Sequence, residues 1–154
     1  MKITQFDNKY LNEMAQLFAD EYSEPDAGRV WNLETAKKYL NRDINSAPEY
    51  CLLALEEDKC VGGVFCRIDP YYTGEMLFVD SLQTKKEYRN KGVAKKLLQE
   101  VFKLAKQSNL LGTHLLADAR EGFPRTWYEA IGFTLSGWAE YEAQWEELER
   151  FISE

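Results

Sequence analysis

The chain has 154 residues, of which 45% are hydrophobic and 29% are charged. These values describe one folded domain rather than a disordered chain, and no apolar run is as long as a membrane-spanning helix. A net charge of -7 argues against nonspecific binding to nucleic acid or to an anionic membrane, and it favours cationic partners. The first ten residues, MKITQFDNKY, contain no apolar export signal, so a cytoplasmic location is expected.

Two helices are expected first along the chain. Apolar residues recur at helical spacing to about residue 21, after a cap at Asp7 or Asn8. A second helix, capped by Asn32, is expected from Leu33 to about Ile44 because its apolar residues again lie on one face.

Three apolar stretches rich in strand-forming residues follow: YCLLALEE, KCVGGVFCRI and EMLFVDSLQT. Short turns separate them, so an antiparallel meander is predicted. Gly62 and Gly63 in the second stretch indicate a bulge or a close approach of another backbone.

The most regular helical pattern begins after Gly92, where apolar residues repeat on one face and lysines occupy the other. The stretch THLLADA then predicts a strand. A short helix is expected from Pro124 through Ile131, with Gly132 as its left-handed C-terminal cap, and a strand is expected from Phe133 to Tyr141.

The end of the chain fits two structures. Tyr141, Ala143 and Trp145 alternate as in a strand, whereas Trp145, Leu148 and Ile152 have helical spacing. The whole order of helices and strands predicts a single α/β domain over residues 1–154.

Cysteine and histidine content argues against several chemistries. Cys51, Cys60 and Cys66 lie in hydrophobic runs without CxxC spacing, so buried reduced thiols are expected. His114 is the single histidine, which excludes a two-histidine zinc site, and no metal site is expected.

Positive charge is concentrated in one stretch of this acidic chain. Residues 85–96 hold a single acid, Glu87, and their basic members are Lys85, Lys86, Arg89, Lys91, Lys95 and Lys96. A strand ending near Thr84, a short loop and a helix starting near Gly92 place unpaired amides and the positive end of a helix dipole together. This arrangement predicts an anion site, although charge alone favours a solvated helix face.

The spacing within this stretch resembles a known family. Arg89-Asn-Lys-Gly92-Val-Ala94 matches the pattern Arg/Gln-x-x-Gly-x-Gly/Ala of the acyl-CoA pyrophosphate loop in GNAT-type N-acyltransferases. LQTKKEYRNKGVAKKLL resembles the strand, loop and helix around that loop, WYEAIGF resembles the motif Tyr-Glu-Lys-x-Gly-Phe, and VGGV resembles the glycine-bearing third strand. These motifs occur in the family's order over most of residues 61–133.

The resemblance implies a fold and a cofactor. The fold is α/β, with a mixed, mostly antiparallel sheet of six to seven strands flanked by four helices and splayed between the fourth and fifth strands. Acetyl-CoA (coenzyme A) would enter that opening. The residues implied to bind it are Leu82, Gln83 and Thr84 beside the pantetheine, and Arg89, Asn90, Lys91, Gly92, Val93 and Ala94 around the diphosphate.

The chain also departs from the family pattern. Glu121 stands where many members carry an asparagine, and Pro124 replaces a common alanine. The segment after Phe133 is shorter than is usual before the final strand.

Three residues are candidates for proton transfer. Tyr128 matches the family tyrosine near the thioester sulfur, where a phenol would act as general acid; the alternative is a core aromatic on a short helix. Asp80, inside an apolar strand, is the first candidate for the base that deprotonates the amine, and Glu75 is the second. A hydrogen-bonded carboxylate at a strand bulge is an equal alternative for Asp80.

These features predict an acetyl-CoA-dependent N-acetyltransferase that uses direct transfer. Clusters of acid near residues 20–26 and 140–147 favour a cationic small-molecule or peptide amine as acceptor, and a homodimer is an expectation from the family. Two alternatives stay open: a noncatalytic acyl-CoA-binding sensor, and a binding module whose basic helix contacts an acidic protein.

Overall fold

Residues 1–153 are described by a computed structural model and fall into two compact units, Met1–Leu116 and Ala117–Glu154. Each unit is described separately, and the expectation of a single domain over residues 1–154 stays a prediction. Within residues 1–153, no helix has the length and apolarity needed to cross a bilayer.

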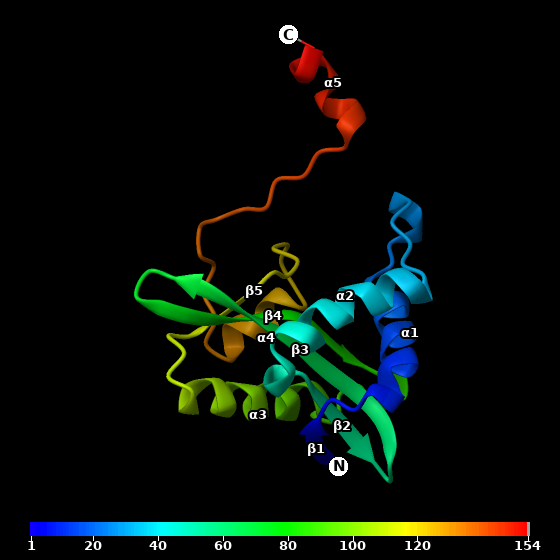
Figure 1. The fold of residues 1–154 in the computed structure, drawn as a ribbon, viewed down its shortest axis with the longest axis vertical. Helices are drawn as coiled ribbons and strands as arrows, with labels where there is room; N and C mark the ends of the chain where they lie inside the picture. The colour runs from blue at the N-terminus through cyan, green and yellow to red at the C-terminus, as the bar shows by residue number, and fades with distance from the viewer. Residues whose placement is uncertain (154) are drawn as a thin grey trace. The chain divides into compact units, whose positions relative to one another are not determined.

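A mixed sheet forms the centre of the first unit, with strand order β1-β2-β3-β4-β5 (Figure 1). The strands are β1 Lys2–Gln5, β2 Leu52–Glu56, β3 Lys59–Tyr71, β4 Gly74–Thr84 and β5 Thr113–Leu115. The first four pair antiparallel, which confirms the predicted meander, and β5 pairs parallel to β4. The sequence did not reveal β1, because KITQ is too short to show alternation.

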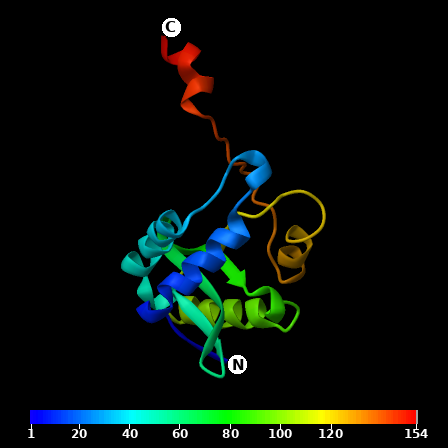
Figure 2. The same cartoon turned by 90° about the vertical axis from the view of Figure 1, so that its right-hand side faces the viewer.

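Helices cover both faces of this sheet. Helix α1 (Leu11–Tyr22) and helix α2 (Leu33–Ser46) pack together against one face, and α3 (Val93–Gln107) packs against the other (Figure 2). The two predicted strand glycines mark these faces: a Cβ on Gly62 would lie 3.0 Å from the Val93 side chain, and one on Gly63 would lie 3.2 Å from Met14 Sδ. Buried apolar side chains of α1, α2 and the sheet form the core.

Local signals in the sequence explain where the helices start. The Asn32 side chain accepts a hydrogen bond from Thr35 N–H while the Thr35 hydroxyl accepts one from Asn32 N–H, a reciprocal cap that fixes the start of α2. Asp7 caps a short 3₁₀ turn, Asn8–Tyr10, that leads into α1. The predicted cap of α2 is confirmed, whereas α1 begins at Leu11 after Tyr10, which provides no side-chain cap.

Two bulges interrupt the strand pairing. The β2–β3 register shifts opposite Ala54 and Leu55, so Val61 is the extra residue beside Gly62, as the glycines predicted. The β3–β4 register shifts between Phe65 and Cys66, which leaves Asp80 as the extra residue of β4.

The second unit contains two helices, α4 (Arg125–Ala130) and α5 (Trp145–Ser153). The expected short helix and its cap are present, with Gly132 at φ +112°. The predicted strand from Phe133 to Tyr141 is wrong: these residues form no strand, because no neighbouring strand receives their backbone hydrogen bonds. In the ambiguous last segment, the helical spacing prevails.

Candidate active site

The loop before α3 has the geometry of an anion site. Asn90 and Gly92 adopt left-handed conformations, with φ of +59° and +78°. The first hydrogen bond that closes the helix is donated by Lys96 N–H to Gly92 O at 3.0 Å, so the amides of Val93, Ala94 and Lys95 have no intrahelical acceptor. These amides carry the positive end of the helix dipole. A Cβ on Gly92 would meet no atom within 4 Å, so glycine is needed here for its backbone conformation and not for packing space.

Basic side chains beside this loop are held by acids of α1. Arg89 forms an ion pair with Glu21, and its Nε donates to Thr84 O at 3.4 Å. Lys85 pairs with Glu13. A cavity of about 870 Å³ lies along this line and is bordered by α1, residues 23–31 and residues 85–89. The predicted acids Asp20 and Glu21 are among its lining residues, so the first acidic cluster borders the basic loop directly.

The second half of β4 has an open edge. The short strand β5 pairs only with Leu77, Phe78 and Val79, so residues 80–84 have no strand on that side, as expected for a sheet splayed between its fourth and fifth strands. At Leu82 the Tyr22 hydroxyl accepts from the backbone N–H and donates to the backbone carbonyl, both at 3.1 Å. The Tyr22 side chain of α1 therefore satisfies both backbone hydrogen-bonding groups of Leu82.

Buried polar groups accumulate along the same half of β4. Ser81 Oγ, both amide atoms of Gln83 and Thr84 Oγ1 are buried and have no hydrogen-bond partner within residues 1–153. Buried polar groups in folded proteins are nearly always satisfied, so these call for water or ligand atoms. Thr84 lies on the α3 face of the sheet, opposite Gly62, and with the uncapped start of α3 it fits a ligand that carries an anionic end.

Asp80 lies in a charged cluster on the α2 side of the sheet. Its side chain is 2% exposed and contacts two guanidinium groups, those of Arg42, at 2.9 Å, and Arg67. Arg42 also contacts Asp43, whose side chain is fully buried, at 3.2 Å. Burial, with the neighbouring Asp80 charge, raises the pKa of Asp43 to about 7. Asp80 thus matches the alternative of a hydrogen-bonded carboxylate at a strand bulge, and its role as a base stays a prediction.

Arg67 connects this cluster to β5. Its guanidinium lies 3.8 Å from the centroid of the Phe78 ring and donates to Asp69 at 2.9 Å. His114 Nε2 lies 3.3 Å from the other Asp69 oxygen, and the His114 ring packs edge-on against Phe78. The single histidine therefore lies at the edge of the cluster.

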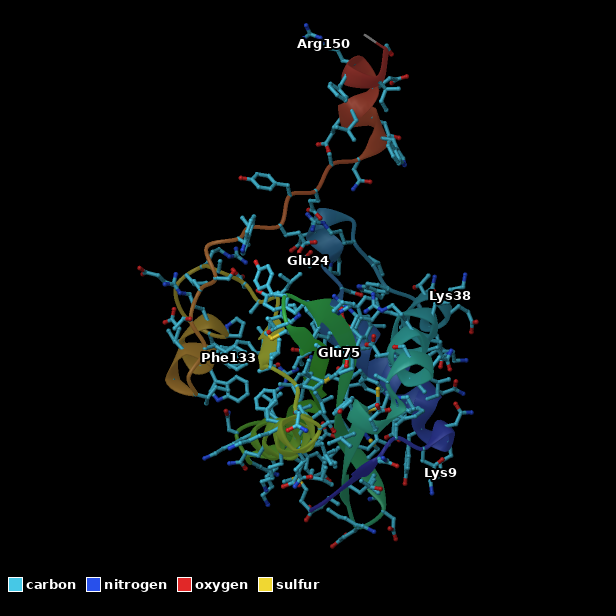
Figure 3. The ribbon with its side chains drawn as sticks, turned by 60° about the vertical axis from the view of Figure 1, so that its left-hand side comes forward. Lys9, Glu24, Lys38, Glu75, Phe133 and Arg150 are labelled. Carbon is cyan, nitrogen blue, oxygen red and sulfur yellow. The ribbon has the colours of Figure 1, made fainter. Side chains whose placement is uncertain are left out.

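Glu75 lies apart from Asp80. It is exposed near the start of β4 (labelled in Figure 3), and its carbonyl accepts from Leu111 N–H at 2.8 Å. Asp80 lies five positions further along the strand, roughly 17 Å away at the usual rise. The structure does not bring these two candidate bases together.

Tyr128 belongs to α4 in the second unit. Its ring contacts Trp127 and Phe133, with centroids 5.0 and 5.6 Å away. Burial raises the pKa of the phenol, so it stays protonated at neutral pH. These ring contacts are those expected for a packed aromatic, and the protonated state is the one that a general acid requires.

The sequence interpretation missed Asp43, Arg42 and Arg67. A signal for Asp43 was present: it lies three residues after Leu40 and seven after Ala36, both fully buried, which puts a carboxylate on the apolar face of its helix. No comparable signal marks the two arginines, because their role depends on which strands and helices meet.

Comparisons with known proteins agree on one family. The sequence model of the Acetyltransferase (GNAT) family matches residues 11–133. The chain is 28% identical to N-alpha-acetyltransferase 30 of Schizosaccharomyces pombe over 133 residues, covering 85% of this chain and 82% of that protein. It is 27% identical over 86 residues to N-alpha-acetyltransferase MAK3 of Arabidopsis thaliana, covering 56% and 45% of the two chains. The fold superposes on ribosomal-protein-alanine N-acetyltransferase from Brucella melitensis with a TM-score of 0.69 and 22% identity, covering 94% of this chain and 99% of that one.

Proposed function

The chain belongs to the GNAT acetyltransferase family and is an N-acetyltransferase, and we propose that its acceptor is the α-amino group of a peptide or protein. Members of the family use acetyl-CoA as acyl donor. The observation that carries the donor site is the loop before α3, where amides without acceptors surround a left-handed glycine next to a basic stretch. The names of the two sequence relatives support the choice of an α-amino acceptor.

The donor would be held by two neighbouring segments of the first unit. Backbone groups from Arg89 to Ala94 would bind the diphosphate, and the open edge at Leu82, Gln83 and Thr84 would lie beside the pantetheine. The orphaned polar atoms of β4 support this assignment. Because the Tyr22 hydroxyl occupies the backbone of Leu82, pantetheine binding at that residue would displace it.

Direct transfer to the amine fits the thiols of this chain. A covalent route would need a cysteine that ionises readily, but Cys51, Cys60 and Cys66 are all buried. Burial raises the pKa of Cys51 to about 12 and that of Cys60 to about 11. The protonated thiols are poor nucleophiles, so the amine itself is the nucleophile in our proposal.

Proton transfer is assigned to the residues predicted for it. An ammonium must lose a proton before it attacks a thioester, and we assign that step to Asp80, with Glu75 as the second candidate. Tyr128 would supply a proton to the departing thiolate, which its protonated phenol supports.

The charge of the residues that line the cavity supports a cationic acceptor. The cavity beside α1 is lined by four acids, Glu13, Asp20, Glu21 and Glu87, against three basic residues. Two of these acids pair with Lys85 and Arg89, which leaves Asp20 and Glu87 against Lys86, an excess of one negative charge that would attract a positively charged acceptor.

The test combines binding and turnover. The melting temperature would be measured with increasing acetyl-CoA on the wild type, on Gly92→Glu and on the control Gly28→Glu, whose glycine has a similar φ of +69° and equally open surroundings. Ligand at about a hundred times its Kd adds roughly 2.7 kcal/mol to a folded state that alone binds it. We expect the rise in the wild type and the control, and its loss in Gly92→Glu.

Thiol release from acetyl-CoA is then followed over peptides with free or blocked α-amino groups and over polyamines. Release only with free peptide amines supports the proposal. A saturable rise in melting temperature without release for any amine would indicate a noncatalytic acyl-CoA-binding chain, and no rise at all would remove the donor site.

A further inference from the structure

Two buried carboxylates lie against one guanidinium group in the first unit. Asp43 comes from α2 and Asp80 from the bulge of β4, and their side chains are 0% and 2% exposed. Arg42 Nε lies 3.2 Å from Asp43 Oδ1, and its Nη2 lies 2.9 Å from Asp80 Oδ1. The two carboxyl groups are therefore neighbours, although 37 positions of sequence separate them.

The remaining oxygen of each carboxyl group lacks a donor. Asp43 Oδ2 and Asp80 Oδ2 are both buried, and no residue of 1–153 donates a hydrogen bond to either. A buried carboxylate oxygen without a donor is costly. A proton on Asp43 lowers this cost, because a neutral carboxyl group is less costly to bury than a carboxylate and can donate a hydrogen bond. The geometry therefore calls for a proton held between the two residues.

The surrounding charges do not neutralise both carboxylates. Three acids and two guanidinium groups form the cluster, so one negative charge is in excess when all the acids are ionised. The ionisable groups facing the pair come from every element packed on it: Tyr39 and Arg42 of α2, Arg67 and Asp69 of β3, His114 of β5 through Asp69, and the thiols of Cys51 and Cys66. An excess negative charge in a buried cluster favours uptake of one proton.

We propose that the base of the acetyl transfer is the Asp43–Asp80 pair, in which Asp80 receives the proton of the acceptor ammonium and Asp43 shares and retains it. The inference rests on the proposed function. Because Asp80 is only 2% exposed, the proton reaches it through a water molecule. Asp43 does not touch the substrate and acts through Asp80, which makes it a positioning residue.

The proton balance is complete. The ammonium gives one proton to the carboxyl pair, and the free amine forms the N–C bond to the thioester carbonyl. As the C–S bond breaks, its electron pair stays on sulfur. The nitrogen loses its second proton and the thiolate gains one proton, so these two transfers cancel. The pair then releases its proton to solvent, so the reaction yields amide, thiol and one proton.

The raised pKa of Asp43 suits this role. A general base works best when its pKa lies near the working pH. Above about pH 7 Asp43 is ionised and the pair accepts a proton. Below it the pair already holds one, so kcat at saturating amine should fall towards acid pH.

The first test is the pH dependence of kcat in Asp43→Asn, which keeps the shape of the side chain and can donate a hydrogen bond to Asp80. We expect the acidic limb to move to lower pH and the plateau of kcat to drop about tenfold, with acetyl-CoA binding unchanged. The control is Asp58→Asn, an exposed aspartate in the β2–β3 turn at φ +62°, where asparagine is well tolerated. Its profile should coincide with that of the wild type.

A second measurement needs no folded variant. In wild-type chain labelled with ¹³C at the aspartate side-chain carboxyl carbons, the resonance of Asp43 should shift near neutral pH. An Asp43 signal that titrates in the ordinary acid range would overturn the shared proton.

The outcomes separate the inference from the function on which it rests. A wild-type chain that acetylates amines, with an acidic limb unmoved in folded Asp43→Asn, overturns the pair alone. A wild-type chain that binds acetyl-CoA but acetylates no amine overturns the proposed function, whatever the carboxyl titration shows.

Discussion

The two units differ in how their residues are buried. The first unit contains a core that includes Met14, Leu40, Leu53 and Phe65, all without exposed surface. In the second, no residue from 117 to 153 is buried, and Leu135, Trp138 and Tyr141 are more than half exposed. The first unit therefore has an extensive buried core of its own, while the motif WYEAIGF lies on and just after the six-residue helix α4.

The largest test of this difference truncates one aromatic residue in each unit. Phe65→Ala empties a fully buried position and should lower the free energy of unfolding by about 4 kcal/mol. Trp138→Ala removes a larger side chain that is 87% exposed and should change it by less than about 0.5 kcal/mol. Urea denaturation measures both, and a cost above 2 kcal/mol for Trp138→Ala would show that the second unit has a core after all.

Carboxylates in the two units should respond to pH with opposite sign. The pKa of Asp43 is raised from 3.8 to about 7, so between these values the folded chain holds a proton that the unfolded chain has released. This group therefore lowers stability as pH rises from about 4 to 7. Asp118, hydrogen-bonded by Arg120, has a pKa lowered to about 2, and its contribution is present above pH 4 and lost as pH falls towards 2.

Replacing each of these aspartates by asparagine tests how each carboxylate changes stability with pH. Relative to the wild type, Asp43→Asn should gain stability between pH 5 and pH 8, by on the order of 2 kcal/mol. Asp118→Asn should be less stable than the wild type by a constant amount between pH 5 and pH 8, and this difference should shrink as pH falls to 3. Urea titrations at pH 3, 5 and 8 provide the comparison, and parallel curves for Asp43→Asn and the wild type would contradict the assigned ionisation.

The smallest effects concern how helices are held at the surface. Asn32→Ala breaks the reciprocal cap of α2 and should cost about 1 kcal/mol. Arg125→Ala removes a pair with Glu129 one turn away on α4, at 2.8 Å, and should cost about 0.4 kcal/mol. Thermal melts in parallel would rank them, and a reversed order would indicate that α4 contributes more to stability than its length suggests.

Local chemistry explains which elements could be predicted from sequence. Signals that act within a few residues can be recognised in the sequence. Examples are the Asn32 cap, the glycine pair in β3 and the apolar face of α3. The strand expected over 133–141 depends on a partner strand elsewhere, and propensity cannot supply one. The failure to predict β1 has the same cause, because its four residues become a strand only through pairing with β2.

The candidate site divides along the same line. The anion loop could be predicted because one glycine, one strand end and one helix start are adjacent in the chain. The cluster around Asp80 could not, since α2, β3 and β4 must first be brought together before Arg42, Arg67 and Asp43 meet. Asp80 alone stood out, as a charge inside an apolar strand.

The hydrogen bonds between Tyr22 and Leu82 also affect the tendency of this chain to aggregate. An unpaired strand edge is a template to which other polypeptides can add, and the outer side of residues 80–84 is such an edge. The Tyr22 hydroxyl is hydrogen-bonded to both the N–H and the carbonyl of Leu82. These two groups are therefore not available to pair with another strand. A side chain from α1 thus serves as a guard against aggregation in a sheet whose fifth strand ends early.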